Sequence, residues 1–236
     1  MPGTEKFAAT RWTLVVKARG DDAVAQSALS ELCEAYYAPV VTFLRSEGRD
    51  EDTARELAHG FFERVLAGGS LRGADRERGR FRSYLLGAVK HFLGDMRDRS
   101  AADKRGGGVA PVSLEDTASG LNVPAPESPD SERAYDRQWA LTIIARGLAI
   151  VEVELCGAGK EAMFETLKPW ITGESAANSQ AAAAEALHMG EGAVKVAIHR
   201  LRQRFRAAVK AEIAQTVPAE SDIDDELRHL IAVLAA

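Results

Sequence analysis

The chain has 236 residues, 46% of them hydrophobic, and carries 30 Lys and Arg against 35 Asp and Glu, which gives a formal net charge of −5. This apolar fraction argues against wholesale disorder, and no apolar run approaches the roughly 18 residues that a membrane helix needs. Two cysteines make no disulfide framework, and the first residues lack the basic and apolar stretches of a signal peptide, so we expect a cytoplasmic protein.

Helical periodicity dominates the N-terminal half and predicts an all-α fold. Apolar residues recur at spacings of three and four between Leu29 and Phe43, with Pro39 expected to kink that helix. Acids at 50–52 open a second predicted helix, which ends at the glycines 68–69 and buries Ala54, Leu57, Phe61 and Val65. A third helix is predicted from about Phe81 to Arg99, with an inward stripe of Phe81, Leu85, Ala88 and Phe92.

The C-terminal half predicts a second helical domain. Residues 103–130 are rich in Gly and Pro, which is typical of a flexible interdomain linker. We therefore expect a first domain at 1–102, a second domain at 131–217 and an amphipathic helix at 218–236. The residues expected on one side of that last helix are Ile223, Leu227, Leu230, Ile231 and Leu234. It could pack on the second domain or receive a regulator.

The charge is concentrated in two segments. Residues 72–105 carry ten basic and five acidic side chains, for +5, and residues 195–210 carry six basic side chains and no acidic one, for +6. The rest of the chain therefore carries −16. Because phosphate binding responds to the local field, the acidic total does not exclude a nucleic-acid partner. A solvated helix face is the alternative for either segment.

One enzyme-like pattern occurs at residues 157–162, which match a loose Gly-x-Gly-x-x-Ala dinucleotide fingerprint. That fingerprint needs a preceding strand within a parallel sheet. The run 150–156 fits either an alternating strand or a helix through Ile144, Leu148, Val151 and Leu155. Since no other segment has the pattern of a strand, we expect no nucleotide site. The histidines and cysteines lack metal-ligand spacing, so we expect no metal, no cofactor and no catalytic residue.

The basic segment near the C-terminus predicts a helix-turn-helix. A short helix at 180–187 and a tight turn at 188–190 precede a second helix from about Glu191. The second helix turns Val194, Ile198, Leu201 and Phe205 inward. It carries Lys195, His199, Arg202 and Arg206 on the opposite side. A plain helical hairpin with a soluble basic face is the alternative.

Five stretches resemble bacterial extracytoplasmic-function sigma factors. GEGAVKVAIHRLRQRFR (190–206) resembles their promoter-binding fourth region, and DTARELAHGFFERVL (52–66) resembles the helix of their second region that grips the polymerase clamp. RGRFRSYLLGAVKHFLGDMRDRSAADKRGG (78–107) resembles the helix that melts and reads the minus-ten element. TRWTLV (10–15) and the tail at 212–234 resemble one branch of the family.

The resemblance implies an all-α protein of two helical domains that has no enzymatic activity, binds core RNA polymerase and directs initiation at promoter DNA. An anti-sigma regulator is a further candidate partner, and a membrane is not expected. The alternative is a helix-turn-helix regulator that binds DNA without polymerase. The usual Leu-Gly-Met-Ser turn of the family is Leu187-His188-Met189-Gly190 here, so His188 must adopt a backbone conformation usually left to glycine.

Three sets of site residues follow from the resemblance. Core-polymerase contacts are expected at Asp52, Glu56, Leu57, Phe61 and Phe62. Minus-ten contacts, where cationic and aromatic groups would hold unstacked bases, are expected at Arg80, Arg82, Tyr84, Lys90, His91, Arg97, Arg99, Lys104 and Arg105. Minus-thirty-five contacts are expected at Glu191, Gly192, Ala193, Lys195, Val196, His199, Arg200 and Arg202.

Overall fold

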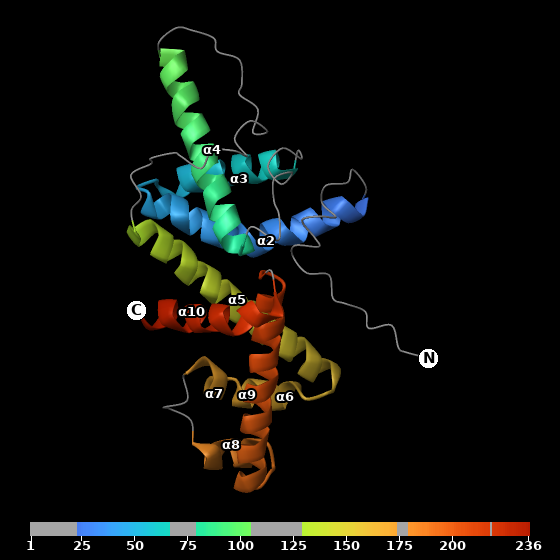
Figure 1. Ribbon diagram of the computed structural model, residues 1–236. Helices are drawn as coiled ribbons and strands as arrows, with labels where there is room; N and C mark the ends of the chain where they lie inside the picture. Colours follow the sequence, from blue (N-terminus) through green and yellow to red (C-terminus); the bar gives the residue numbers. More distant parts are fainter. Residues whose placement is uncertain (1–22, 67–78, 105–128, 174–178, 218) are drawn as a thin grey trace. The chain divides into compact units, whose positions relative to one another are not determined.

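A computed structural model describes residues 23–66, 79–104, 129–173, 179–217 and 219–236. Regular structure in these ranges is entirely helical, which confirms the all-α prediction (Figure 1). None of the described helices combines the length and apolar character needed to span a membrane. The predicted linker residues 105–128, the candidate Arg105 and the TRWTLV stretch at 10–15 lie outside the described residues.

Internal contacts divide the chain into two units, which differ from the predicted domains. Unit 1 comprises residues 1–142 with 214–236, and unit 2 comprises residues 143–213. The boundary falls inside one continuous helix, α5 (Pro129–Gly157). Residues 131–142 belong to unit 1 because their side chains pair with those of helix α4 (Phe81–Lys104), as Lys90 does with Glu132. The bounds predicted at 102, 131 and 217 therefore do not coincide with the contact units.

Unit 1 contains α2 (Ala23–Ser46), α3 (Glu51–Leu66), α4, the first turns of α5, the short 3₁₀ turn η4 (Glu220–Asp222) and α10 (Ile223–Ala235). Helix α2 continues through Pro39. Asp50 caps α3, since its carboxylate accepts the Thr53 backbone N–H at 3.0 Å, and this bond lowers the pKa of Asp50. The structure thus confirms a helix that begins at the acids 50–52.

Aromatic side chains form much of the core of unit 1. The rings of Tyr36 and Phe81 lie 5.1 Å apart, and those of Phe61 and Phe92 lie 5.8 Å apart, both edge to face. Most predicted inward residues of α3 and α4 are buried, whereas Leu57 and Ala88 are half-buried. Helix α4 also buries Val89 and Leu93, because it contacts α2, α3 and α5 rather than one neighbour.

Helix α10 departs from its predicted pattern. Leu230 is buried, but Ile231 is 55% exposed, so the predicted apolar side is wrong at Ile231. Glu226 is fully buried instead. A carboxylate is tolerated there because two arginines pair with it, Arg82 of α4 at 2.6 Å and Arg80 just before α4 at 2.9 Å.

Unit 2 contains the rest of α5 with α6 (Glu161–Leu167), α7 (Pro169–Thr172), α8 (Gln180–Ala186) and α9 (Glu191–Ala214). Its core includes Val151, Leu155, Phe164, Leu167, Val194, Ile198 and Leu201. Residues 150–156 are helical, so the strand that a dinucleotide fingerprint requires is not formed there. The residues after α5 make a turn in which the Lys160 N–H donates to the Leu155 carbonyl at 2.8 Å.

Candidate nucleic-acid interface

A tight turn joins α8 to α9. Ser179 caps α8, because its hydroxyl accepts the Ala182 N–H at 3.0 Å. The turn closes with the Met189 N–H donating to the Ala184 carbonyl at 2.9 Å. His188 has a φ of 52°, which is the left-handed conformation. This confirms the prediction that His188, which stands where the family has glycine, adopts a glycine-like backbone. Helix α8 (180–186) ends one residue before the predicted bound, and α9 begins at the predicted Glu191.

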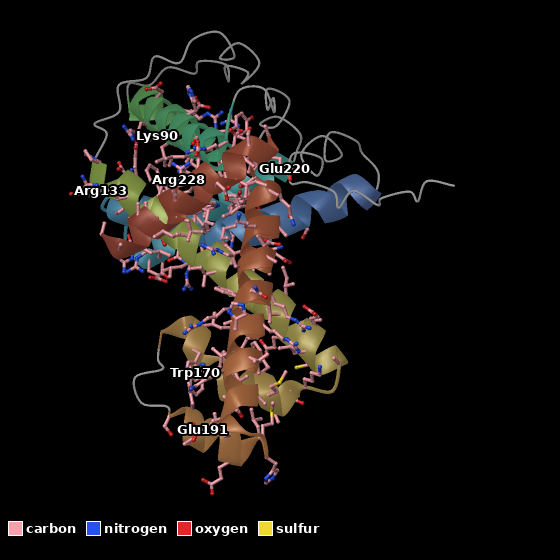
Figure 2. All side chains as sticks on the ribbon, turned by 60° about the horizontal axis from the view of Figure 1, so that its bottom comes forward. Lys90, Arg133, Trp170, Glu191, Glu220 and Arg228 are labelled. Atoms are coloured by element: carbon pink, nitrogen blue, oxygen red, sulfur yellow. The ribbon has the colours of Figure 1, made fainter. Side chains whose placement is uncertain are left out.

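Helix α9 has one buried side and one exposed basic side. Val194, Ile198 and Leu201 are buried and Phe205 is half-buried, which confirms the predicted stripe. The exposed residues include Lys195, His199, Arg200, Arg202, Arg204 and Arg206. Glu191 and Gly192 are exposed in the first turn, and Figure 2 shows Glu191 at the free end of the helix. A basic helix face of this kind can place cations against phosphates and its first turns against bases.

An apolar groove of about 480 Å³ runs along part of α9 within unit 2. The predicted DNA contacts Ala193, Val196 and Arg200 line it, together with Met163 of α6 and Met189 of the turn. Val196 is 49% exposed. Ala and Val can contact only apolar base groups such as the thymine methyl, so any hydrogen-bonded readout by the predicted contacts would fall to Glu191, Lys195, His199, Arg200 and Arg202.

Two arginines of α9 also contact their own unit. The Arg202 Nε donates to the Trp170 carbonyl at 3.2 Å, and Arg204 forms an ion pair with Glu154 at 2.9 Å. Both arginines stay exposed. These contacts orient the two side chains, and Glu154 offsets part of the positive field around Arg204.

The predicted minus-ten cations fall into two groups along α4. In the N-terminal half, Arg82 is only 8% exposed and pairs with Glu226 and Asp136, while Arg80, just before the helix, also pairs with Glu226 at 2.9 Å. Burial alone would lower the pKa of Arg82, but the two carboxylates outweigh burial and raise it. Lys90 pairs with Glu132. In this structure these cations neutralise carboxylates of unit 1.

Near the C-terminal end of α4, Arg97 and Arg99 are exposed, whereas Tyr84 and His91 of its N-terminal half are half-buried. Lys104 ends the helix, although its side chain lies outside the described part of the chain.

The predicted polymerase contacts of α3 are also divided. Asp52 and Glu56 are exposed and Leu57 is half-buried, whereas Phe61 and Phe62 are 1% and 5% exposed. The two phenylalanines are core residues, with ring centroids 5.1 Å apart, so the structure does not offer them to a partner.

Sequence reasoning missed an exposed aromatic pair and three acids. His59 of α3 stacks on Tyr37 of α2, with its Nε2 3.0 Å from the tyrosine hydroxyl. The acids that pair with the cations of α4 are Glu132, Asp136 and Glu226. The pairing of Glu226 could have been suspected from the sequence, because its spacing from Ile223 and Leu230 puts a carboxylate on the apolar side of α10.

Comparison of the chain with family models, with curated proteins and with solved structures found no match.

Proposed function

We propose that the protein is a sigma factor of the extracytoplasmic-function type, which binds core RNA polymerase and directs initiation at specific promoters. The observation that carries the proposal is the exposed basic side of α9, with Lys195, His199, Arg200 and Arg202 opposite a buried apolar stripe. The resemblance of five stretches of the chain to that family, in the family's order, supports it further.

In this proposal α8 and α9 act as a helix-turn-helix. The first turns of α9 lie against the bases of the minus-thirty-five element and the later arginines hold phosphates. Helix α4 engages the opened minus-ten region. Two weak readers on one chain can bind one promoter together, so that their joint affinity exceeds either alone. The acidic remainder of the chain repels DNA from other surfaces.

A helix-turn-helix regulator that acts without polymerase is the second candidate. The burial of Phe61 and Phe62 favours it, because part of the predicted polymerase surface is then core. Footprinting of an operator by the free protein at nanomolar concentration would support this candidate over a sigma factor.

Gel filtration with bacterial core polymerase at low salt tests the main proposal. The full chain should elute with polymerase and direct transcription from a promoter. Replacing Asp52 by Asn and Glu56 by Gln should weaken the complex, because both acids are exposed on α3. Glu34→Gln, which removes an exposed acid from α2, is the matched control and should not weaken it. Absence of any complex would contradict the proposal.

A further inference from the structure

Helix α10 is acidic in its first turn and lies against the N-terminal half of the basic helix α4. We infer that α10 is an internal partner of that half of α4, held by Arg80 and Arg82, and that nucleic-acid contacts of α4 are confined to its C-terminal half with Arg97 and Arg99. The nucleic-acid part of this inference rests on the proposed function, whereas the role of α10 does not.

The two oxygens of the Glu226 carboxylate are divided between two arginines. The Arg82 Nε donates to Oε1 at 2.6 Å, and the Arg80 Nε lies 2.9 Å from Oε2. The Glu226 side chain is 0% exposed and that of Arg82 is 9% exposed. The bond from Arg82 is a charge-assisted hydrogen bond closed to solvent, whereas Arg80, whose side chain is 35% exposed, makes an ion pair without a hydrogen bond.

Other contacts fix Arg82 in the same place. Its guanidinium also pairs with Asp136 of α5 and lies 5.3 Å from the centre of the Trp139 ring. The hydroxyl of the buried Tyr135 donates to the Arg82 carbonyl at 3.1 Å. His229 of α10 lies 3.1 Å from the second Asp136 oxygen. Arg82 is therefore bound on several sides, by groups from α5 and α10.

The segment before α10 is attached to α4 independently of these charges. The Phe81 N–H, at the start of α4, donates to the Thr216 carbonyl at 3.0 Å. Thr216 and Val217 are each 1% exposed. Helix α10 thus follows a segment that is itself buried against the first turn of α4, as expected of a permanent part of unit 1.

A nucleic acid could reach Arg82 only by separating a buried pair, which would leave the Glu226 carboxylate uncompensated in the core. Arg97 and Arg99 are already exposed and need no such rearrangement. Figure 1 shows the last turns of α4 extending past α2 and α3, away from α10. Lys90 of α4 pairs with Glu132 in the first turns of α5, and Figure 2 shows Lys90 near Arg133 of the same turns.

Two full-chain variants of α4 test where nucleic acid binds. Binding to a fluorescent single-stranded oligonucleotide of mixed sequence is measured at low salt. Arg97→Gln should weaken binding roughly threefold to tenfold, because it removes a phosphate contact. Arg80→Gln removes the same charge from the N-terminal half and should change the Kd by less than about twofold. Equal weakening by both variants would overturn the inference.

Two variants of α10 test its role without any DNA. Glu226→Gln should lower the Tm by about 10 °C, because it breaks a buried pair. Asp225→Asn removes an exposed charge from the same turn and should leave the Tm nearly unchanged. Equal Tm values for Glu226→Gln and the unmodified chain would overturn the inference, as would tighter DNA binding by Glu226→Gln, since α10 would then compete with DNA. Failure of the chain to bind any DNA, alone or together with core polymerase, would contradict the proposed function and leave the melting comparison valid.

Discussion

Gly147 of α5 and Val209 of α9 lie so close that a Cβ atom at residue 147 would be 2.8 Å from Cγ2 of the valine. Gly147→Ala should therefore destabilise unit 2. The change gains about 1 kcal/mol of helix propensity, but crowding a packed core costs about 1–3 kcal/mol. We expect a net loss of about 1 kcal/mol in the free energy of unfolding, measured by urea denaturation.

The control for that substitution lies in α4. A Cβ atom at Gly87 would meet nothing within 4 Å, so Gly87→Ala should stabilise the protein by up to about 1 kcal/mol. Adding Val209→Ala to Gly147→Ala should relieve the crowding, and a double-mutant cycle should show favourable coupling. Additive effects of the two changes would contradict the assigned contact.

Ser179 determines where α8 begins, because its hydroxyl accepts the Ala182 N–H. Ser179→Ala should lower the free energy of unfolding by about 1 kcal/mol, whereas Ser179→Asn keeps a capping acceptor and should cost little. Urea denaturation followed by circular dichroism measures both. If the proposed helix-turn-helix is correct, the alanine variant should also bind DNA more weakly, since α8 supports the turn before α9.

Tyr135 makes unit 1 sensitive to alkali. Burial, and next the neighbouring Tyr36, raise its pKa well above the ordinary value of 10.0. A phenol whose pKa is higher in the folded chain than in the unfolded chain contributes stability below pH 10, and that contribution is lost as the pH rises further. The unmodified protein should therefore unfold on alkaline titration, and tyrosinate absorbance should rise together with the loss of helix.

Tyr135→Phe separates ionisation from packing. The variant loses the bond to the Arg82 carbonyl, so its stability at pH 7 should fall by about 1 kcal/mol. Its stability should then depend less steeply on pH above 10. An unchanged alkaline slope would mean that another group controls the alkaline transition.

Many buried apolar positions of the fold could be predicted from spacing, although Ile231 of α10 could not. Phe81, Leu85 and Val194 were predicted from periodicity to face inward, and all three are buried. Periodicity shows which side of a helix is apolar, but not which neighbours cover it. Spacing therefore did not predict that α4 is covered on several sides, or that the boundary between the two units falls inside α5.

The candidate site was harder to predict, because a basic side chain looks the same in sequence whether it faces DNA or a carboxylate. Arg82 stands three residues before Leu85 and seven before Val89, so it shares their buried side. Its partner Glu226 lies 144 residues away. The sequence around Arg82 does not indicate that Glu226 is its partner, nor the reverse. Only the folded structure distinguishes buried, paired cations such as Arg82 from exposed ones such as Arg97.

Lys195 should contribute to the salt dependence of DNA binding. It is exposed in the second turn of α9, beside the residues expected to meet bases. Each phosphate contact releases counterions, so removing one lowers the slope of log K against log salt by about 0.9. Lys195→Gln should show this change in fluorescence anisotropy titrations over a range of salt concentrations.

Arg204→Gln is the matched control for Lys195→Gln, because the charge of Arg204 is already offset by Glu154 at 2.9 Å. For Arg204→Gln, the slope of log K against log salt should change by clearly less than for Lys195→Gln. Equal slopes for both variants would mean that the basic side of α9 acts as a uniform positive field, since a uniform field depends on total charge alone. A smaller change for Lys195→Gln than for Arg204→Gln would place the DNA on the Glu154 side of the helix and contradict the proposed orientation.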